Sequence, residues 1–264
     1  MAHMNGFTYG WVNPLMAFLV ACVGAALGLR CTVRSLALPP ERRRGWLFLA
    51  AASIGCGIWA MHFIAMLGFT VSDTTLVYDI PLTLGSLLVS VAVVGVGVFY
   101  VGYRPQGWGT LLVGGTLTGV GVAAMHYMGM AAMALDGHVH YDLGMVALSV
   151  AVAVLAATAA LWMTLNVRGL WAALVAALVA GVAVCAMHYI AMQAVSVQVD
   201  GSVAAAGVPA SQLILPVAVG IIVFLTVAGI VVAMSPPEGA RDGRDLETEE
   251  RIQVVLFDGR TRGL

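Results

Sequence analysis

The sequence contains no lysine. All twelve basic residues are arginine, and with 13 acidic residues they give a net charge of −1. A seven-helix protein that holds retinal needs a lysine to form the Schiff base, so the retinal proteins are excluded. The nearly balanced charge also gives no indication of nucleic-acid binding.

Charge of either sign is scarce. Charged residues make up 9% of the chain and hydrophobic residues 61%, whereas a typical soluble protein carries roughly 25% charged residues. So few charges cannot cover a surface that faces water. Lipid must therefore be the solvent for most of this chain.

The sequence also lacks the signs of a disulfide framework and of a signal peptide. The chain has only four cysteines, all in apolar runs, which predicts small buried thiols rather than a disulfide framework; they are Cys22, Cys31, Cys56 and Cys185. The N-terminus lacks the basic segment and the clear cleavage site of a signal peptide. We therefore expect the first apolar run to be a retained helix.

Seven apolar runs are long enough to cross a membrane, which takes about 20 residues in a helix. They cover about Asn13–Leu38, Trp46–Phe69, Ile80–Tyr103, Trp108–Leu135, Leu143–Leu165, Leu170–Val197 and Ser211–Met234. The predicted fold class is an all-α membrane protein, a seven-transmembrane-helix bundle. We expect residues 10–235 to form this membrane domain.

Every arginine lies on one side of this arrangement, in or beside the loops after the first, third and fifth runs or in the C-terminal tail. The segments on the other side carry only aspartate as charge. The positive-inside rule then predicts an external N-terminus and a cytoplasmic C-terminus. The tail, residues 236–264, is expected to be cytoplasmic and flexible, and too short for an independent output domain.

A motif occurs three times, once in each even-numbered run. Its histidines are His62, His126 and His188, spaced by 64 and 62 residues. That period equals two helices and two loops, so the chain consists of three helix pairs and one additional helix. With the expected boundaries, each histidine lies roughly 9–14 Å below the outer end of its helix.

Residues i and i+4 share one face of a helix, so each histidine is expected to lie beside the methionine that follows it by four positions. These methionines are Met66, Met130 and Met192. The methionines directly before the histidines, Met61, Met125 and Met187, are rotated by about 100°. Imidazole combined with thioether suits Cu(I), and imidazole also suits Cu(II).

A buried histidine more often serves as a hydrogen-bonded core residue, and methionine commonly fills gaps between membrane helices. The three copies nevertheless differ at one neighbouring position, which holds Trp59, Ala123 and Cys185, while the Ala-Met-His-aromatic-x-small-Met pattern is the same in all three. Polar groups inside a membrane also tend to be functional. The repeat therefore favours a metal or cofactor site.

These segments resemble the signature of the MHYT-domain family of bacterial integral-membrane sensors, over about residues 10–235. The resemblance implies seven helices in the plasma membrane, copper bound by methionine and histidine near the outer face, and sensing of O2, CO or NO. The matching residues are Met61, His62 and Met66; Met125, His126, Tyr127 and Met130; and Met187, His188, Tyr189 and Met192. No copy spells the family name in full: the threonine is replaced by Ile64, Met128 or Ile190, and the first copy has Phe63 for tyrosine.

Several alternatives remain open at this stage. Tyr127 and Tyr189 could donate a hydrogen bond to a bound gas or to a metal ligand, or they could be interfacial aromatic residues. The outer segment with His138 and His140 could capture a metal, although a solvated loop is the simpler interpretation. The favoured function is a non-enzymatic copper sensor with a separate signalling partner; the alternatives are a copper transporter or carrier and a haem-binding redox protein.

Overall fold

The computed structural model describes residues 4–6, 8–72, 74–166, 170–199 and 206–235. Two compact units are distinguished, Met1–Ala228 and Gly229–Leu264. All features discussed below as a site lie in the first unit. The tail expected at residues 236–264 lies outside the described residues.

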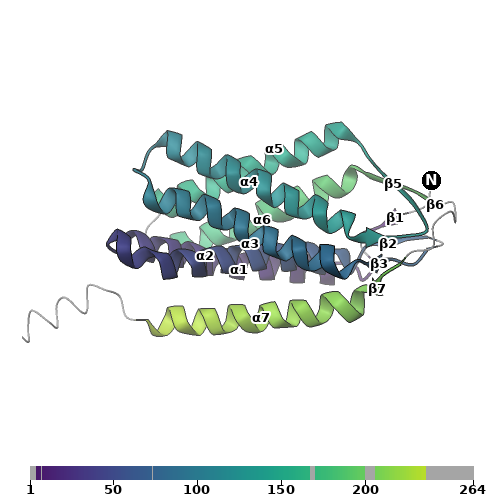
Figure 1. Ribbon diagram of the computed structural model, residues 1–264, viewed down its shortest axis with the longest axis horizontal. Coiled ribbons are helices and arrows are strands. Elements are labelled where there is room, and N and C mark those ends of the chain that lie inside the picture. The colour runs from purple at the N-terminus through teal and green to yellow at the C-terminus, as the bar shows by residue number, and fades with distance from the viewer. Residues whose placement is uncertain (1–3, 7, 73, 167–169, 200–205, 236–264) are drawn as a thin grey trace, which may run out of the picture. The chain divides into compact units, whose positions relative to one another are not determined.

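Seven long helices account for most of the described chain (Figure 1). They are α1 Val12–Leu36, α2 Arg43–Met66, α3 Ile80–Tyr103, α4 Trp108–Ala131, α5 Leu143–Asn166, α6 Leu170–Gln193 and α7 Ala210–Met234. All seven are long and apolar enough to span a membrane. The predicted fold class and the number of helices are confirmed.

The even-numbered helices end earlier than the apolar runs suggested. Their last residues are Met66, Ala131 and Gln193, three to four positions before the expected ends. The residues that follow form short strands whose side chains are also buried, such as Val71, Met133 and Val197. An apolar run does not show where a buried helix gives way to a buried strand.

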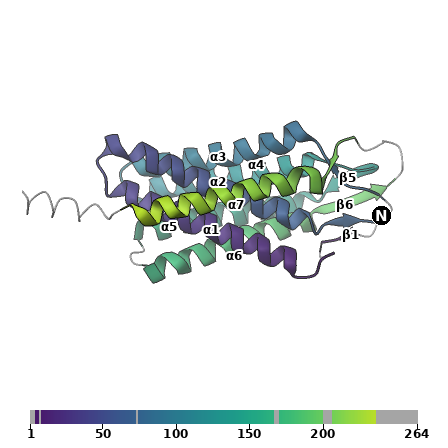
Figure 2. The same ribbon diagram turned by 90° about the horizontal axis from the view of Figure 1, so that it is seen from below.

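The strands form a cap at the end of the bundle where α2, α4 and α6 terminate (Figure 2). β1 (Met4–Asn5) pairs with β2 (Thr70–Val71). β3 (Val77–Tyr78) lies between β4 (Met133–Ala134) and β7 (Val208–Pro209). β5 (Gly137–Tyr141) pairs over five residues with β6 (Val195–Val199). The sequence predicted no strands: it placed Met133–Ala134 and the first part of β6 in helices and the other segments in loops.

Two aspartates cap the starts of α3 and α5, which leave the strand cap. The Leu82 amide donates to the carboxylate of Asp79 at 2.7 Å, and the Met145 amide donates to that of Asp142 at 2.8 Å. Such bonds satisfy a backbone donor that has no partner inside the helix. The repeated Tyr-Asp pairs at 78–79 and 141–142 are therefore the ends of strands followed by helix caps.

The first six helices form a closed ring. Each packs mainly against its neighbours in the sequence, α6 returns to pack against α1, and α2 also contacts α4 and α6. Very close approach occurs between α1 and α2, where a Cβ added to Gly57 would lie 2.9 Å from the Cα of Gly24. Small residues permit such packing between membrane helices. The ring turns the motif faces of the three even-numbered helices toward one centre.

Candidate metal centre

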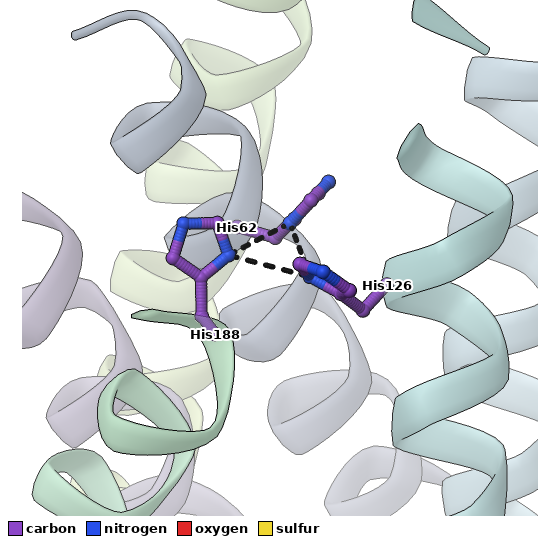
Figure 3. A group of neighbouring side chains, drawn as sticks. All are labelled: His62, His126 and His188. Carbon is purple, nitrogen blue, oxygen red and sulfur yellow. Dashed lines mark hydrogen bonds between the residues drawn. The ribbon is translucent and has the colours of Figure 1, made fainter. Parts of the chain in front are cut away.

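The three motif histidines converge inside the ring (Figure 3). The Nδ1 atom of His62 lies 3.1 Å from Nδ1 of His126 and 3.1 Å from Nδ1 of His188, and the third distance is 3.3 Å. All three side chains are at most 2% exposed. The three copies of the repeat therefore contribute their histidines to one centre.

The histidines lie close to the strand cap. His62 precedes the end of α2 by four residues, and His126 and His188 precede the ends of α4 and α6 by five. At 1.5 Å per residue this depth is about 6–8 Å. It is shallower than the sequence suggested, because the helices end earlier.

The nitrogen triangle has the size of a metal site. A point equidistant from the three Nδ1 atoms lies roughly 1.8 Å from each, while metal–imidazole bonds measure about 2.0–2.1 Å. The three nitrogens are therefore close enough together that they would hold one ion between them. Among the described residues, these three form the one group of three or more His, Cys, Asp or Glu with such spacing.

Hydrogen bonds alone cannot account for the triangle. In a neutral imidazole, Nδ1 is either a donor or an acceptor. Three atoms in mutual contact cannot all be paired as donor with acceptor, so at least one contact joins two like atoms. A cation between the three lone pairs turns each unfavourable contact into a bond.

The Nε2 atoms of the rings are also consistent with metal binding through Nδ1. If Nδ1 binds a metal, Nε2 must carry the proton. The Nε2 atoms of His62 and His126 are buried, and neither has a hydrogen-bond partner among the described residues. No competing bond therefore holds these two rings in place, and packing must set their orientation.

Packing around His62 comes from α4. A Cβ added to Gly129 would lie 2.5 Å from Nε2 of His62 and 3.2 Å from Cζ of Phe63. Glycine is thus required where the backbone of α4 contacts the imidazole. Gly129 is a positioning residue that the sequence analysis did not single out.

Gly129→Ala is expected to displace the His62 ring and to lower metal affinity by about tenfold or more, the scale seen when groups that orient metal ligands are altered. Gly95→Ala is the matched control, since its Cβ would make only an ordinary contact, 3.6 Å from Cβ of Ala51. Both changes raise helix propensity equally. Metal titration of both variants should separate them; equal affinities would show that Gly129 does not position His62.

The six candidate methionines lie in three environments. Met66, Met125 and Met130 belong to the main core cluster, against which Met192 packs. Met61 belongs to a separate cluster with Ala17, Ala21 and Ala65. Met187 lines a cavity on the other side of the histidines. The main cluster also contains strand residues such as Tyr78 and Val195, so the methionines at i+4 lie toward the strand cap.

The two candidate tyrosines also differ. The Ser149 hydroxyl donates to the carbonyl of Val146, so the Tyr127 hydroxyl donates to Ser149, at 2.8 Å. This bond ties α4 to α5. Tyr189 packs with Met61 and Cys185, and its ring meets that of His188 edge-to-face at 5.0 Å.

An aromatic group missed in the sequence analysis supports His62. Phe63 contacts the rings of His62 and Trp59, with centroids 4.6 and 4.4 Å away. The Trp59 indole donates to Ser86 at 2.9 Å and so fixes α2 to α3. Phe63 also packs against Tyr78 of β3, where burial raises the pKa of the phenol.

The outer pair His138 and His140 is separate from the three buried histidines. Both are exposed, on the same face of β5, opposite Gln198 and Ser196 of β6. The expected solvated loop is therefore a paired strand. The four cysteines are free; Cys22 and Cys31 are buried as expected, whereas Cys56 and Cys185 are only partly buried.

Fold and site together define a multi-pass membrane protein with a buried three-histidine centre built from an internal repeat. The family model described as "Bacterial signalling protein N terminal repeat", MHYT, matches residues 55–114, 119–177 and 181–242. The chain belongs to this family. The resemblance stated from the sequence is confirmed.

Curated relatives are signalling proteins. The chain is 33% identical over 97% of its length to the bifunctional diguanylate cyclase/cyclic di-GMP phosphodiesterase MucR of Pseudomonas aeruginosa, and 38% identical over 74% to the cyclic di-GMP phosphodiesterase NbdA of the same species. It is 30% identical over 93% to an uncharacterized signaling protein of Caulobacter vibrioides. The chain spans 39%, 26% and 30% of the length of these relatives. No solved structure matches it.

Proposed function

We propose that this chain is the sensory part of a signalling system in the bacterial plasma membrane, and that it binds copper through His62, His126 and His188. The carrying observation is the triangle of three buried Nδ1 atoms 3.1–3.3 Å apart, which is unfavourable without a cation. Bound copper would supply a redox-active centre with room for one further small ligand, such as O2, CO or NO.

The surroundings favour copper over harder ions. Met66, Met130 and Met192 follow the histidines by one turn and offer thioethers from the strand-cap side. Thioether is a soft donor that suits Cu(I), whereas carboxylates and water suit Mg²⁺ or Ca²⁺. We propose that these three thioethers serve a single ligand position on the strand-cap side, which leaves the opposite face of the site open, with Met61, Met125 and Met187 packing around the site and Tyr189 beside it.

Transport of copper is less well supported. A cation leaving the triangle along the helices would next meet Ile58, Val122 and Val184, one turn before the histidines. Two turns before, it would meet Ile54, Thr118 and Ala180. These residues offer a charged ion little compensation for lost ligands.

Haem is also less well supported. Two axial histidines must face each other across the porphyrin plane. Here the three ring centroids lie 4.7, 5.0 and 5.2 Å apart. The third imidazole therefore occupies the space that a macrocycle between the other two would need.

The function is tested by metal selectivity. The purified chain should bind one copper ion per molecule in competition with zinc, and Met130→Ala should weaken Cu(I) more than Cu(II), because thioether is the softer donor. The measurement is affinity for each ion with competing chelators. Preference for zinc or a Soret band in the visible spectrum would overturn the copper assignment, and equal losses for both copper states would refute Met130 as a thioether ligand.

We also propose an orientation. Arg34, Arg43 and Arg104 lie at the helix ends opposite the strand cap, so the positive-inside rule places the cap and the histidines outside. A fluorescent protein fused to the C-terminus should fold in the cytoplasm, and an N-terminal epitope should be cleaved by external protease in intact spheroplasts. Protection of both ends would contradict this topology.

The output is proposed to reach a cyclic di-GMP enzyme, because two relatives are named as enzymes of that nucleotide. The described region itself is proposed to bind rather than to catalyse. A change in ligands at the centre would alter how tightly α2, α4 and α6 are held together, and such a change can bias a signalling partner.

A further inference from the structure

An apolar cavity of about 90 Å³ lies inside the helix ring, on the side of the histidines away from the strand cap. Its lining follows the repeat. The residues four and eight positions before each histidine all contribute: Ile58 and Ile54, Val122 and Thr118, Val184 and Ala180. Met187, next to His188, also lines it. The cavity therefore begins about one helical turn from the nitrogen triangle.

The surface of this cavity is apolar. It is lined by aliphatic side chains, Met187 and three threonines. The Thr32 hydroxyl donates to the Gly28 carbonyl and that of Thr164 to the Ala160 carbonyl, both at 2.8 Å. The Thr118 hydroxyl lies directly against Gly97 of α3. The Thr118 hydroxyl has no hydrogen-bond partner among the described residues, but this one group falls short of the two to four polar partners that a buried water needs.

The size permits a small ligand. One water needs roughly 10–15 Å³ of such volume, and an apolar cavity of about 150 Å³ stays dry and takes up benzene or xenon. A cavity of about 90 Å³ therefore has room for a molecule of a few heavy atoms. Its lining would exclude ions and favour an uncharged guest that partitions into the bilayer.

We infer that this cavity is a binding chamber for a small uncharged apolar molecule of diatomic size, and that it presents the molecule to the open face of the histidine centre. The two faces of the nitrogen triangle differ. Methionines at i+4 lie toward the strand cap, while i−4 residues lead into the chamber. A guest in the chamber can donate a lone pair to the metal without displacing a protein ligand. Only this last step depends on the proposed function.

The chamber itself is tested on the full chain without metal. In crystals pressurised with xenon, an anomalous peak is expected between Ile58, Val122 and Val184. Ala157→Leu on α5 adds bulk to the lining and should remove that peak, and Ala180→Leu on α6 should do the same from another helix. Ala159→Leu is the matched control, because Ala159 is exposed and not part of the lining.

A parent crystal without xenon in the chamber, or with ordered water there, would overturn the inference. Xenon binding in a chain that takes up no copper would instead refute the proposed function and leave the chamber standing.

The presentation step is tested with CO on the copper-loaded, reduced protein. Ala157→Leu should slow CO association about tenfold, the factor given by ~1.36 kcal/mol of barrier, at unchanged copper content. Equal rates in Ala157→Leu and Ala159→Leu would refute presentation from the chamber.

Discussion

Replacing His126 by alanine is expected to lower copper affinity by more than ~100-fold, beyond the loss caused by altering groups that merely orient ligands. His126 supplies one corner of the nitrogen triangle, at 3.1 Å from His62 and 3.3 Å from His188. Two imidazoles on two helices would remain, and α4 would contribute no nitrogen. The measurement is the copper content of the purified variant after equilibration against a chelator of known affinity.

The control for this experiment is His138→Ala. His138 is an exposed histidine of β5, and it lies outside the buried group of three. Its loss should leave copper content unchanged. Unchanged copper in His126→Ala, or a loss confined to His138→Ala, would move the site from the membrane to the strand cap.

Copper should also stabilise the folded chain. The three proposed ligands come from α2, α4 and α6, so unfolding the bundle separates them. Binding to the folded state alone raises the free energy of unfolding by about 2.7 kcal/mol when free metal is a hundredfold above its Kd. Thermal denaturation in the same lipid or detergent, with copper and with excess chelator, should show this as a higher midpoint in the presence of metal.

The His126→Ala variant provides the comparison for the stability effect as well. Its midpoint should respond little to copper, because the ion no longer joins three helices. The parent and His138→Ala should respond equally. The same copper-dependent rise in His126→Ala would mean that the metal stabilises the protein from a different site.

The sequence predicted the histidine centre because of the repeat. One position repeated on three helices, at spacings of 64 and 62 residues, becomes three equivalent positions once the helix pairs pack in order around a ring. Convergence then follows from the packing. The sequence could not show that the rings meet through Nδ1, since ring orientation depends on contacts such as that of Gly129 with His62.

The pattern of apolar residues could not show where the even-numbered helices end. Val71, Met133 and Val197 are as buried in short strands as they would be in a helix, so composition extended α2, α4 and α6 too far. The Tyr-Asp pairs were the available signal, because Asp79 and Asp142 are preferred residue types at the start of a helix. The hydrogen bond from Trp59 to Ser86 joins α2 to α3. The sequence could not predict it, because the other two copies of the motif have no tryptophan at this position.

The central claim is that one metal ion binds three imidazoles contributed by the three repeats. X-ray absorption spectroscopy of the chain loaded with one copper ion tests it most directly. We predict a nitrogen shell at about 2.0 Å with the outer scattering pattern of three imidazole rings, reduced to two rings in His126→Ala. A spectrum with no imidazole scattering, or one that is identical in the parent and in His126→Ala, would contradict the claim.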